Sequence, residues 1–406
     1  MALKLLIEKA IISSDYNVYI LLLDMSKAFD TVNRKVLLTE LQTVLDPDEI
    51  HLLSVLTNRP LISIFLDGEQ GNGFHTLVGI CQGDCLSAVL FIYYLAAALK
   101  DDTQDQIPKD LKAFLEIYYA DDLTYATTSK QHKTEIKNSK PQKLKNHNLL
   151  VNISKTEEGE APDKRPPPPP PPPPAEDPGT RILWSPLDWL IPPKMSPPEP
   201  SYKNIKLLGT KLDTKKDIAA RKSKVWQPVQ KMRHFFKSKR LSTNHKIKIY
   251  KSYIETTLLY NSETWSLTKT LEDSLNSFHR RLLRIALNIK YPKTISNEKL
   301  YNITKEIPIT EKIKKRRLAL LGHILRLDAE TPAQKALQFY FTRHERPVGR
   351  PPLTWIQCIT HDLAYTTKHH NIKTPLSLKS LKKLTEIAKD KHRWKQEIAR
   401  SMKRDL

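Results

Sequence analysis

The sequence has few cysteines, no long apolar run and fewer acidic than basic side chains. Its three cysteines among 406 residues, Cys81, Cys85 and Cys358, are too few and too unevenly placed for a disulfide framework. The longest apolar run, around Val18 to Leu23, is far shorter than the roughly 20 residues that a membrane-spanning helix needs. Charged side chains within residues 1–12 argue against a signal peptide. We therefore expect no membrane association and an intracellular location, nuclear and cytoplasmic.

The shortage of acidic residues leaves the chain strongly basic. There are 44 Asp and Glu against 66 Lys and Arg, which gives a net charge of +22. Such a charge attracts a polyanion before any specific contact forms, so nucleic acid is the leading partner. Ribosomal, histone-like and membrane-surface proteins share this balance, however, and motifs must decide between them.

Residues 1–157 alternate β-rich and helical patterns, as a mixed domain does. Val18 to Leu23 is a candidate buried strand that ends on Asp24, and Leu86 to Leu99 has the pattern of a helix. An apolar stretch precedes the two acids of Tyr119–Asp122, and Leu123 to Ala126 follows them. This arrangement predicts a hairpin with both acids in its turn.

Residues 158–200 have a different composition. They hold seventeen of the 29 prolines, including the unbroken run Pro166–Pro174. Such a run favours polyproline II and cannot form a packed core. We expect a proline-rich linker or insertion that acts as a spacer, with a ligand for a proline-binding module as the alternative.

From residue 215 onward the pattern is helical and basic. Apolar side chains recur at helical spacing, which gives each helix one buried face. The clearest stripes are Val225, Val229, Met232 and Phe236, then Ile247, Tyr250, Ile254 and Leu258, then Leu271, Leu275, Phe278, Leu282 and Ile285. We expect a helical bundle with cationic edges, because arginines such as Arg280, Arg281 and Arg284 lie among or beside these stripes.

Three acids are candidates for a metal site. Asp24 at the end of a strand and Asp121 with Asp122 on a facing hairpin would converge without long side chains. Magnesium requires oxygen ligands, and nucleotidyl transfer uses two divalent ions about 4 Å apart. A pair of adjacent acids alone is a poor signal, because surface turns favour Asp. The surrounding motifs are therefore decisive.

Five segments, in this order along the chain, resemble the motifs of reverse transcriptases. They are Leu23–Asp30, Gly79–Ser87, the YADD box Tyr119–Asp122, the group Asn152, Lys155, Thr156 and Glu157, and Leu207–Gly209. Two later segments, Tyr260–Trp265 and Leu321–Arg326, resemble the thumb and trailing region of non-LTR retrotransposon enzymes.

The resemblance implies an α+β right-hand polymerase. Its palm, an antiparallel sheet with packed helices and a remnant of fingers, would span 1–157, and a primer-grip-like hairpin 201–214. An all-α basic thumb at 215–330 and a basic helical region at 331–406 would follow. Only about two dozen residues precede Asp24, whereas intact relatives have a fingers region before this motif. We therefore expect an N-terminally truncated enzyme.

The resemblance also implies site roles. Asp24 and Asp121 would bind both Mg²⁺ ions, and Asp122 would be a weaker ligand or orient its neighbours. The substrates would be an RNA template, a DNA primer and deoxynucleoside triphosphates. Contacts to template and nucleotide would come from Phe29, Gln82, Gly83 and Tyr119, and the primer grip from Leu208 and Gly209.

Three alternatives stay open. Phe29 would either stack under the sugar and exclude a 2′-hydroxyl or serve only as a core aromatic. Lys155 would either protonate the leaving pyrophosphate or cap a solvated loop. The whole chain could also be an inactive retrotransposon fragment that only binds nucleic acid. A zinc finger from Cys358, His361 and His369 is not expected, because paired cysteines at finger spacing are missing.

Overall fold

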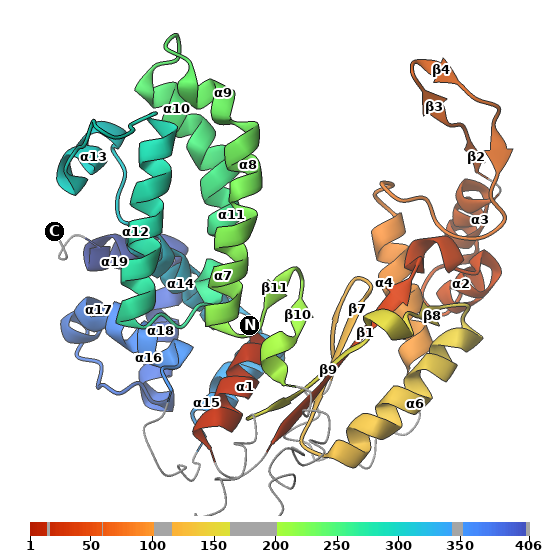
Figure 1. Ribbon diagram of the computed structural model, residues 1–406. Coiled ribbons are helices and arrows are strands. Elements are labelled where there is room, and N and C mark those ends of the chain that lie inside the picture. Colours follow the sequence, from red (N-terminus) through yellow and green to blue (C-terminus); the bar gives the residue numbers. More distant parts are fainter. Residues whose placement is uncertain (14–16, 59, 101–115, 163–200, 343–351, 403–406) are drawn as a thin grey trace, which may run out of the picture.

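The computed structural model has one part that combines a β-sheet with helices and a second, large part that is helical (Figure 1). The proline run Pro166–Pro174, with its predicted role as a spacer or module ligand, lies outside the described residues. No described helix combines the length and the apolar character of a membrane-spanning segment. The structure describes residues 1–13, 17–58, 60–100, 116–162, 201–342 and 352–402.

One antiparallel sheet organises residues 17–162. Its strands are β1 (Val18–Ser26), β6 (Glu116–Tyr119), β7 (Asp122–Thr127), β8 (Leu150–Val151) and β9 (Glu157–Ala161). The order is β6-β7-β1-β8, and β9 also pairs with β1. Strand β1 is therefore flanked on both sides, by β7 on one and by β8 and β9 on the other. Strand β9 extends past residue 157, so the sheet continues into the segment expected to be linker.

The side chains of β1 alternate between two hydrophobic cores, as the two-residue period of a strand requires. Leu21, Leu23 and Met25 join a core with helices α2 (Arg34–Leu41), α4 (Ser87–Leu99) and α6 (Lys130–Asn146). Val18, Ile20 and Leu22 join a second core on the opposite face. Burial on both faces explains why this segment is an unbroken apolar run.

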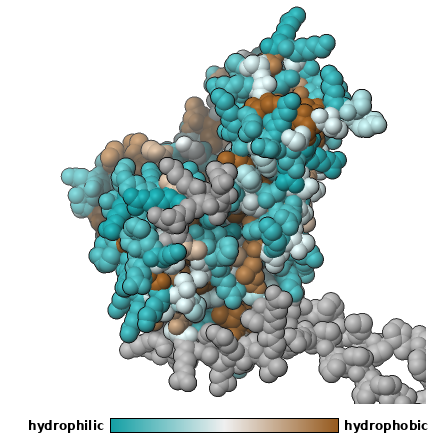
Figure 2. All heavy atoms as spheres, turned by 90° about the vertical axis from the view of Figure 1, so that its left-hand side faces the viewer, coloured by the Kyte–Doolittle hydropathy of each residue, from teal (hydrophilic) through white to brown (hydrophobic). Residues whose placement is uncertain are grey.

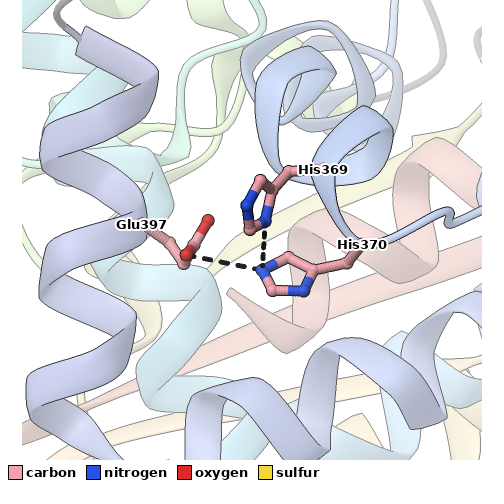
Figure 3. Close-up of side chains that lie close together, drawn as sticks. All are labelled: His369, His370 and Glu397. Atoms are coloured by element: carbon pink, nitrogen blue, oxygen red, sulfur yellow. Dashed lines mark hydrogen bonds and ion pairs between the residues drawn. The ribbon is translucent and has the colours of Figure 1, made fainter.

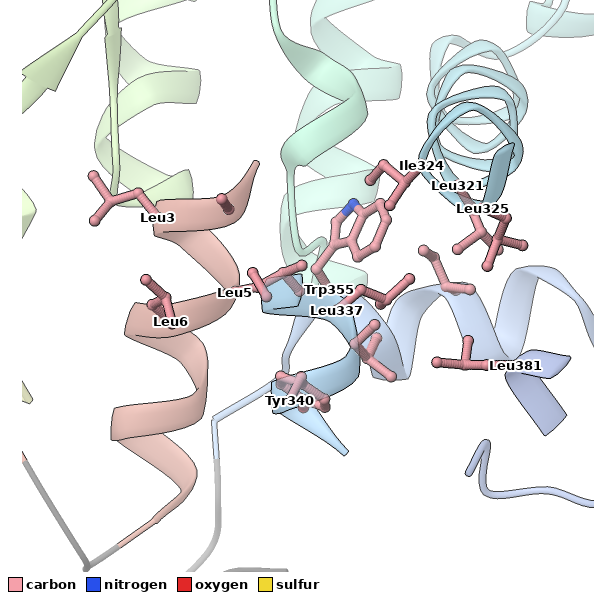
Figure 4. Close-up of a cluster of buried hydrophobic side chains, with 14 of the residues drawn as sticks. Leu3, Leu5, Leu6, Leu321, Ile324, Leu325, Leu337, Tyr340, Trp355 and Leu381 are labelled. Carbon is pink, nitrogen blue, oxygen red and sulfur yellow. The ribbon is translucent and has the colours of Figure 1, made fainter. Parts of the chain in front are cut away.

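The second core consists mainly of elements from the two ends of the chain. The N-terminal helix α1 (Ala2–Ile12) contributes Leu3, Leu5 and Leu6, and Figure 4 shows Leu5 beside Trp355. Further members come from α14 (Ile309–Arg326), α15 (Pro332–Tyr340), α16 (Trp355–Asp362), α18 (Leu378–Lys389) and α19 (Lys391–Met402). Helix α17 (Ala364–His369) lies beside α16 and α19.

The helices between residues 214 and 304, with the start of α14, form a third core, which buries most of the predicted apolar stripes, including Val225, Ile254 and Leu275. In Figure 1 they stand on the opposite side of the sheet from α2 and α4, and Figure 2 shows that their outer surface is predominantly hydrophilic. They are α7 (Thr214–Lys224), α8 (Trp226–Lys231), α9 (Arg233–Lys237), α10 (Thr243–Ile249), a π-helical turn (Tyr250–Glu255), α11 (Thr256–Leu258), α12 (Lys269–Ala286) and α13 (Asn297–Thr304).

A projecting tip lies between α2 and α4 in sequence. Helix α3 (Pro47–Thr57) leads into four short strands, of which β2 (Leu61–Ile62) pairs with β5 (Phe74–His75), and β3 (Phe65–Leu66) with β4 (Glu69–Gln70). Figure 1 shows this tip extending away from the sheet. Its large apolar side chains are exposed, among them Phe65 and Leu66.

Candidate active site

The three predicted acids come together near the C-terminal end of β1. In the antiparallel pairing of β1 with β7, Asp24 lies directly opposite Asp122. Asp121 occupies the two-residue turn between β6 and β7 together with Ala120, whose φ is 51°. Only one acid is therefore in the turn, because Asp122 already pairs with Tyr119 as the first residue of β7.

The electrostatics of this site suit a cation. Partial burial raises the pKa of Asp122 above its usual value, and the negative charges of Asp121 and Asp24 raise it further. Oδ2 of Asp24 is buried and accepts no hydrogen bond. The closest positive group is Nζ of Lys155, at 3.3 Å from that oxygen, and its side chain is 66% exposed. An exposed ammonium is screened by water and only partly offsets three carboxylates.

The residues present fit a divalent metal such as Mg²⁺. All candidate ligand atoms are carboxylate oxygens, which hard cations prefer. Partial burial first, and then repulsion from Asp121 and Asp24, raise the pKa of Asp122 and disfavour its ionised form in the absence of a cation. A bound cation would relieve this repulsion and occupy the free lone pairs of Asp24.

Lys155 reaches the site from a 3₁₀ turn, Ile153–Lys155. The turn is anchored by the backbone N–H of Asn152, which donates to the carbonyl oxygen of Asp24 over 2.7 Å. The structure thus places Lys155 beside an acid of the site, whereas a residue that only capped a loop would not need to contact Asp24.

Phe29 lies in a 3₁₀ turn, Ala28–Thr31, just after β1. Its ring stacks on that of Phe91 in α4, with centroids 4.6 Å apart and an interplanar angle of 22°. Phe91 is fully buried, but Phe29 is only partly buried. One side of the ring therefore has a core contact, while part of it stays accessible to a ligand.

The loop that carries Gln82 and Gly83 is fixed to the segment after β1. Within it, the N–H of Ile80 donates to the carbonyl of Phe29 over 2.9 Å. Gly79 has a φ of 83°, and a Cβ there would lie 2.8 Å from the carbonyl oxygen of Asp30. Only glycine can adopt this positive φ and also leave room for the carbonyl of Asp30 without strain. Gln82 and Gly83 themselves are exposed.

Arg34 holds the same loop from α2, and our sequence reasoning missed it. Its Nε donates to the carbonyl oxygen of Gly79 over 2.6 Å, and its Nη1 donates to that of Thr76 over 2.7 Å. Nη2 donates to Oγ1 of Thr76 and to the carbonyl of Val78. The sequence offers no sign of this role, because these partners are about 40 residues away.

The predicted hairpin at 201–214 is present. Strands β10 (Lys206–Leu207) and β11 (Thr210–Lys211) are joined by a turn at Leu208 and Gly209, whose φ angles are 48° and 75°. Two residues with positive φ match a type I′ turn, which suits tight hairpins. The hairpin is bound to the sheet by Glu157, which accepts from the N–H of Lys206 over 2.6 Å and pairs with Leu22 in β1.

A polar cluster also secures this hairpin to the helices. Arg221 in α7 donates from Nη2 to the carbonyl of Gly209 over 2.7 Å, and Tyr260 donates its hydroxyl to the carbonyl of Leu208 over 2.9 Å. The Arg221 guanidinium lies 4.4 Å from the centre of the Tyr260 ring. Both carbonyls of the turn are thus bound by side chains from the helical part.

Asp217 completes the cluster. Its buried carboxylate accepts from the Trp265 indole over 2.9 Å and from the N–H of Lys211 over 3.1 Å, and it lies 3.7 Å from Nε of Arg221. The segment Tyr260–Trp265, noted in the sequence only for its resemblance, thereby has a structural role. Arg221 and Asp217 were missed, because their spacing resembles that of any helical ion pair.

Comparisons with known proteins identify a family and a relative of the chain. The model of the family "Reverse transcriptase (RNA-dependent DNA polymerase)" matches residues 5–212. An uncharacterized transposon-derived protein of Caenorhabditis elegans is 24% identical over 160 residues, which is 38% of this chain and 54% of that protein. The chain thus spans about half the length of this relative.

Among solved structures, apo telomerase of Candida tropicalis matches with a TM-score of 0.38 and 12% identity, over 98% of this chain and 56% of that one. Telomerase of the same organism in complex with the TWJ fragment of telomeric RNA gives 0.36 and 15%, over 84% and 52%.

Proposed function

Because the chain belongs to the reverse transcriptase (RNA-dependent DNA polymerase) family, we propose that it adds deoxynucleotides to the 3′ end of a DNA primer on an RNA template. The observation that carries this proposal is the convergence of Asp24, Asp121 and Asp122 at one end of β1. The raised pKa of Asp122 supports it, since catalytic sites are where such shifts gather.

The three carboxylates would hold two Mg²⁺ ions. When bound, these ions would activate the attacking 3′ oxygen and neutralise charge on the triphosphate. Lys155, which lies beside Asp24, would donate a proton to the leaving pyrophosphate. Phe29 would present the accessible part of its ring to the nucleotide sugar. Its contact with Phe91 would hold the ring in place, so that a 2′-hydroxyl would collide with it.

The remaining predicted residues would position the nucleic acids. The exposed Gln82 and Gly83, and Tyr119 beside the acids, would contact template and nucleotide. The turn at Leu208 and Gly209 would grip the primer. In this proposal the sheet is the palm, the helices within residues 215–330 are the thumb, and those within 331–406 are a basic C-terminal region.

We further propose that the chain derives from a non-LTR retrotransposon and acts inside the cell, in the nucleus and cytoplasm. The transposon-derived relative supports an origin in a mobile element. The segments Tyr260–Trp265 and Leu321–Arg326 support the non-LTR class by resemblance.

The test is primer extension on an RNA template with purified chain and Mg²⁺. We expect Asp24→Asn and Asp121→Asn each to reduce extension by roughly 100-fold or more, because the charge that holds the metals is lost. Asp30→Asn is the matched control: Asp30 is an exposed acid of the same segment, and its substitution should leave extension unchanged.

RNA binding is measured in parallel by fluorescence anisotropy. If the unmutated chain binds RNA but extends no primer, the alternative holds: a non-catalytic fragment that binds nucleic acid through its net charge of +22. If Asp30→Asn abolishes extension and Asp24→Asn does not, the assignment of the metal ligand in β1 is wrong.

A further inference from the structure

Two histidines and a glutamate meet at the C-terminal end of the fold, far along the chain from the three acids. His369 ends α17, His370 follows it, and Glu397 lies on α19 (Figure 3). Nδ1 of His369 is 3.4 Å from Nε2 of His370, and that nitrogen is 3.4 Å from Oε1 of Glu397. One ligand atom from each residue lies within 4.8 Å of the others.

Glu397 is held in place for binding. The residue is only 2% exposed, and its Oε1 accepts from Nη1 of Arg400 over 2.8 Å. A hydrogen bond from a neighbour to a carboxylate is what orients ligating carboxylates in metal sites. Its Oε2 is buried and has no hydrogen-bond partner. The ion pair with Arg400, whose side chain is 51% exposed, engages Oε1 alone, so a second cation could bind the buried Oε2 side of this carboxylate.

The spacing matches a zinc ion. In a tetrahedral site with Zn–N and Zn–O bonds of about 2.0–2.1 Å, two ligand atoms lie about 3.4 Å apart. The separations of His370 from His369 and from Glu397 have this value, and the third separation is no more than 4.8 Å. Two imidazoles and a carboxylate are also the ligand types that zinc and similar transition metals select over Mg²⁺.

We propose that His369, His370 and Glu397 bind one Zn²⁺ or a similar transition metal ion. The ion would link the end of α17 to α19, whose Trp394 and Ile398 belong to the core that also contains Ile20 and Leu22 of β1. Its role would be to stabilise the packing of these helices. The site differs from the zinc finger considered from sequence, since Cys358 is buried beside the carbonyl of Leu267 and His361 is not in the cluster.

Zinc binding is tested on the full chain after treatment with a chelator. The parent protein for this test carries Asp24→Asn, Asp121→Asn and Asp122→Asn, so that the three acids cannot contribute. Isothermal titration with Zn²⁺ should give one equivalent, and zinc should raise the melting temperature. His369→Ala and Glu397→Gln should each weaken binding roughly 100-fold and abolish the thermal shift.

His361→Ala is the matched control, because His361 is an exposed histidine on the neighbouring α16, and it should bind zinc like the parent. Co²⁺ should give a tetrahedral visible spectrum without a thiolate charge-transfer band. Circular dichroism establishes that each variant is folded, and His369, being exposed, is the substitution least able to disturb the fold. Unchanged zinc binding in His369→Ala and Glu397→Gln, or a thiolate band with Co²⁺, would overturn the proposal.

Discussion

Arg221 offers a sharp test of how the hairpin at residues 206–211 is held. Its guanidinium is 5% exposed, binds the carbonyl of Gly209, lies on the ring of Tyr260 and faces the buried Asp217. Arg221→Ala removes a charged hydrogen bond worth about 1.5–3 kcal/mol and a cation–π contact worth about 0.5–2 kcal/mol. It also leaves the Asp217 carboxylate with only two neutral donors.

The expected loss is therefore about 3–5 kcal/mol in the free energy of unfolding, in the range found when one partner of a buried ion pair is removed. Arg221→Lys should recover only part of it, because an ammonium lacks the planar fork that spans these partners. Chemical denaturation of each variant measures the free energy of unfolding. At temperatures where the variants stay folded, KM for the primer–template should rise more than kcat falls.

The matched control is Lys222→Ala, the next residue along α7. Lys222 is only half-buried, and its ammonium binds Ser274 at the surface. Its loss should cost less than about 1 kcal/mol and leave the primer KM unchanged. If Arg221→Ala costs no more than Lys222→Ala and the primer KM does not move, the cluster does not position the hairpin.

For three further substitutions we expect a change in stability of a definite direction. Gly322→Ala, which in an exposed helix would stabilise, should here cost about 1–3 kcal/mol in urea denaturation, because the added Cβ overlaps the Trp394 indole. Asp122→Asn should reduce extension yet raise the melting temperature at neutral pH without metal, since a neutral amide replaces a carboxyl whose pKa is raised first by partial burial and then by the charges of Asp121 and Asp24. Burial first, then Lys312 and Arg280, lower the pKa of His279 from 6.5 to about 3, so its contribution to stability is present above pH 6.5 and is lost as pH falls toward 3. His279→Leu should flatten this acid-side loss in denaturation curves measured between those pH values.

The sequence was sufficient to predict the elements whose signals are local. Val18 to Leu23 is an apolar run of strand length, and the structure confirms a strand that ends beyond Asp24. The helix predicted at Leu86–Leu99 begins one residue later, at Ser87. The family match confirms the reverse-transcriptase resemblance, which rested on the order of short motifs.

Long-range pairings could not be predicted. In the sequence, Lys4, Glu8 and Lys9 are recognisable only as charged residues within the apolar segment 1–12. In the structure, Lys9 donates to the carbonyls of Tyr340 and Thr342, and Glu8 accepts from Ser266 and from the N–H of Trp355. No pattern within α1 identifies partners hundreds of residues away, because a buried charge and a solvated one have the same sequence signature.

The same limit applies to the histidine cluster. Sequence reasoning grouped His369 with Cys358 and His361, which precede it in the same segment of the chain. The fold instead brings Glu397 to His369 and His370, since α17 and α19 pack together. Spacing predicts a metal site only when its ligands share one local motif, and these ligands come from two helices.

Strand β1 connects these observations physically. Its alternate side chains enter two cores, one with α4 and α6, the other with α1 and the C-terminal helices. Asp24 follows Leu22 on the face that packs against the latter core, at the point where the strand emerges. Because packed interiors transmit small displacements, the position of Asp24 depends on both cores. The C-terminal helices therefore help to fix the position of Asp24, although none of their residues belongs to the candidate active site.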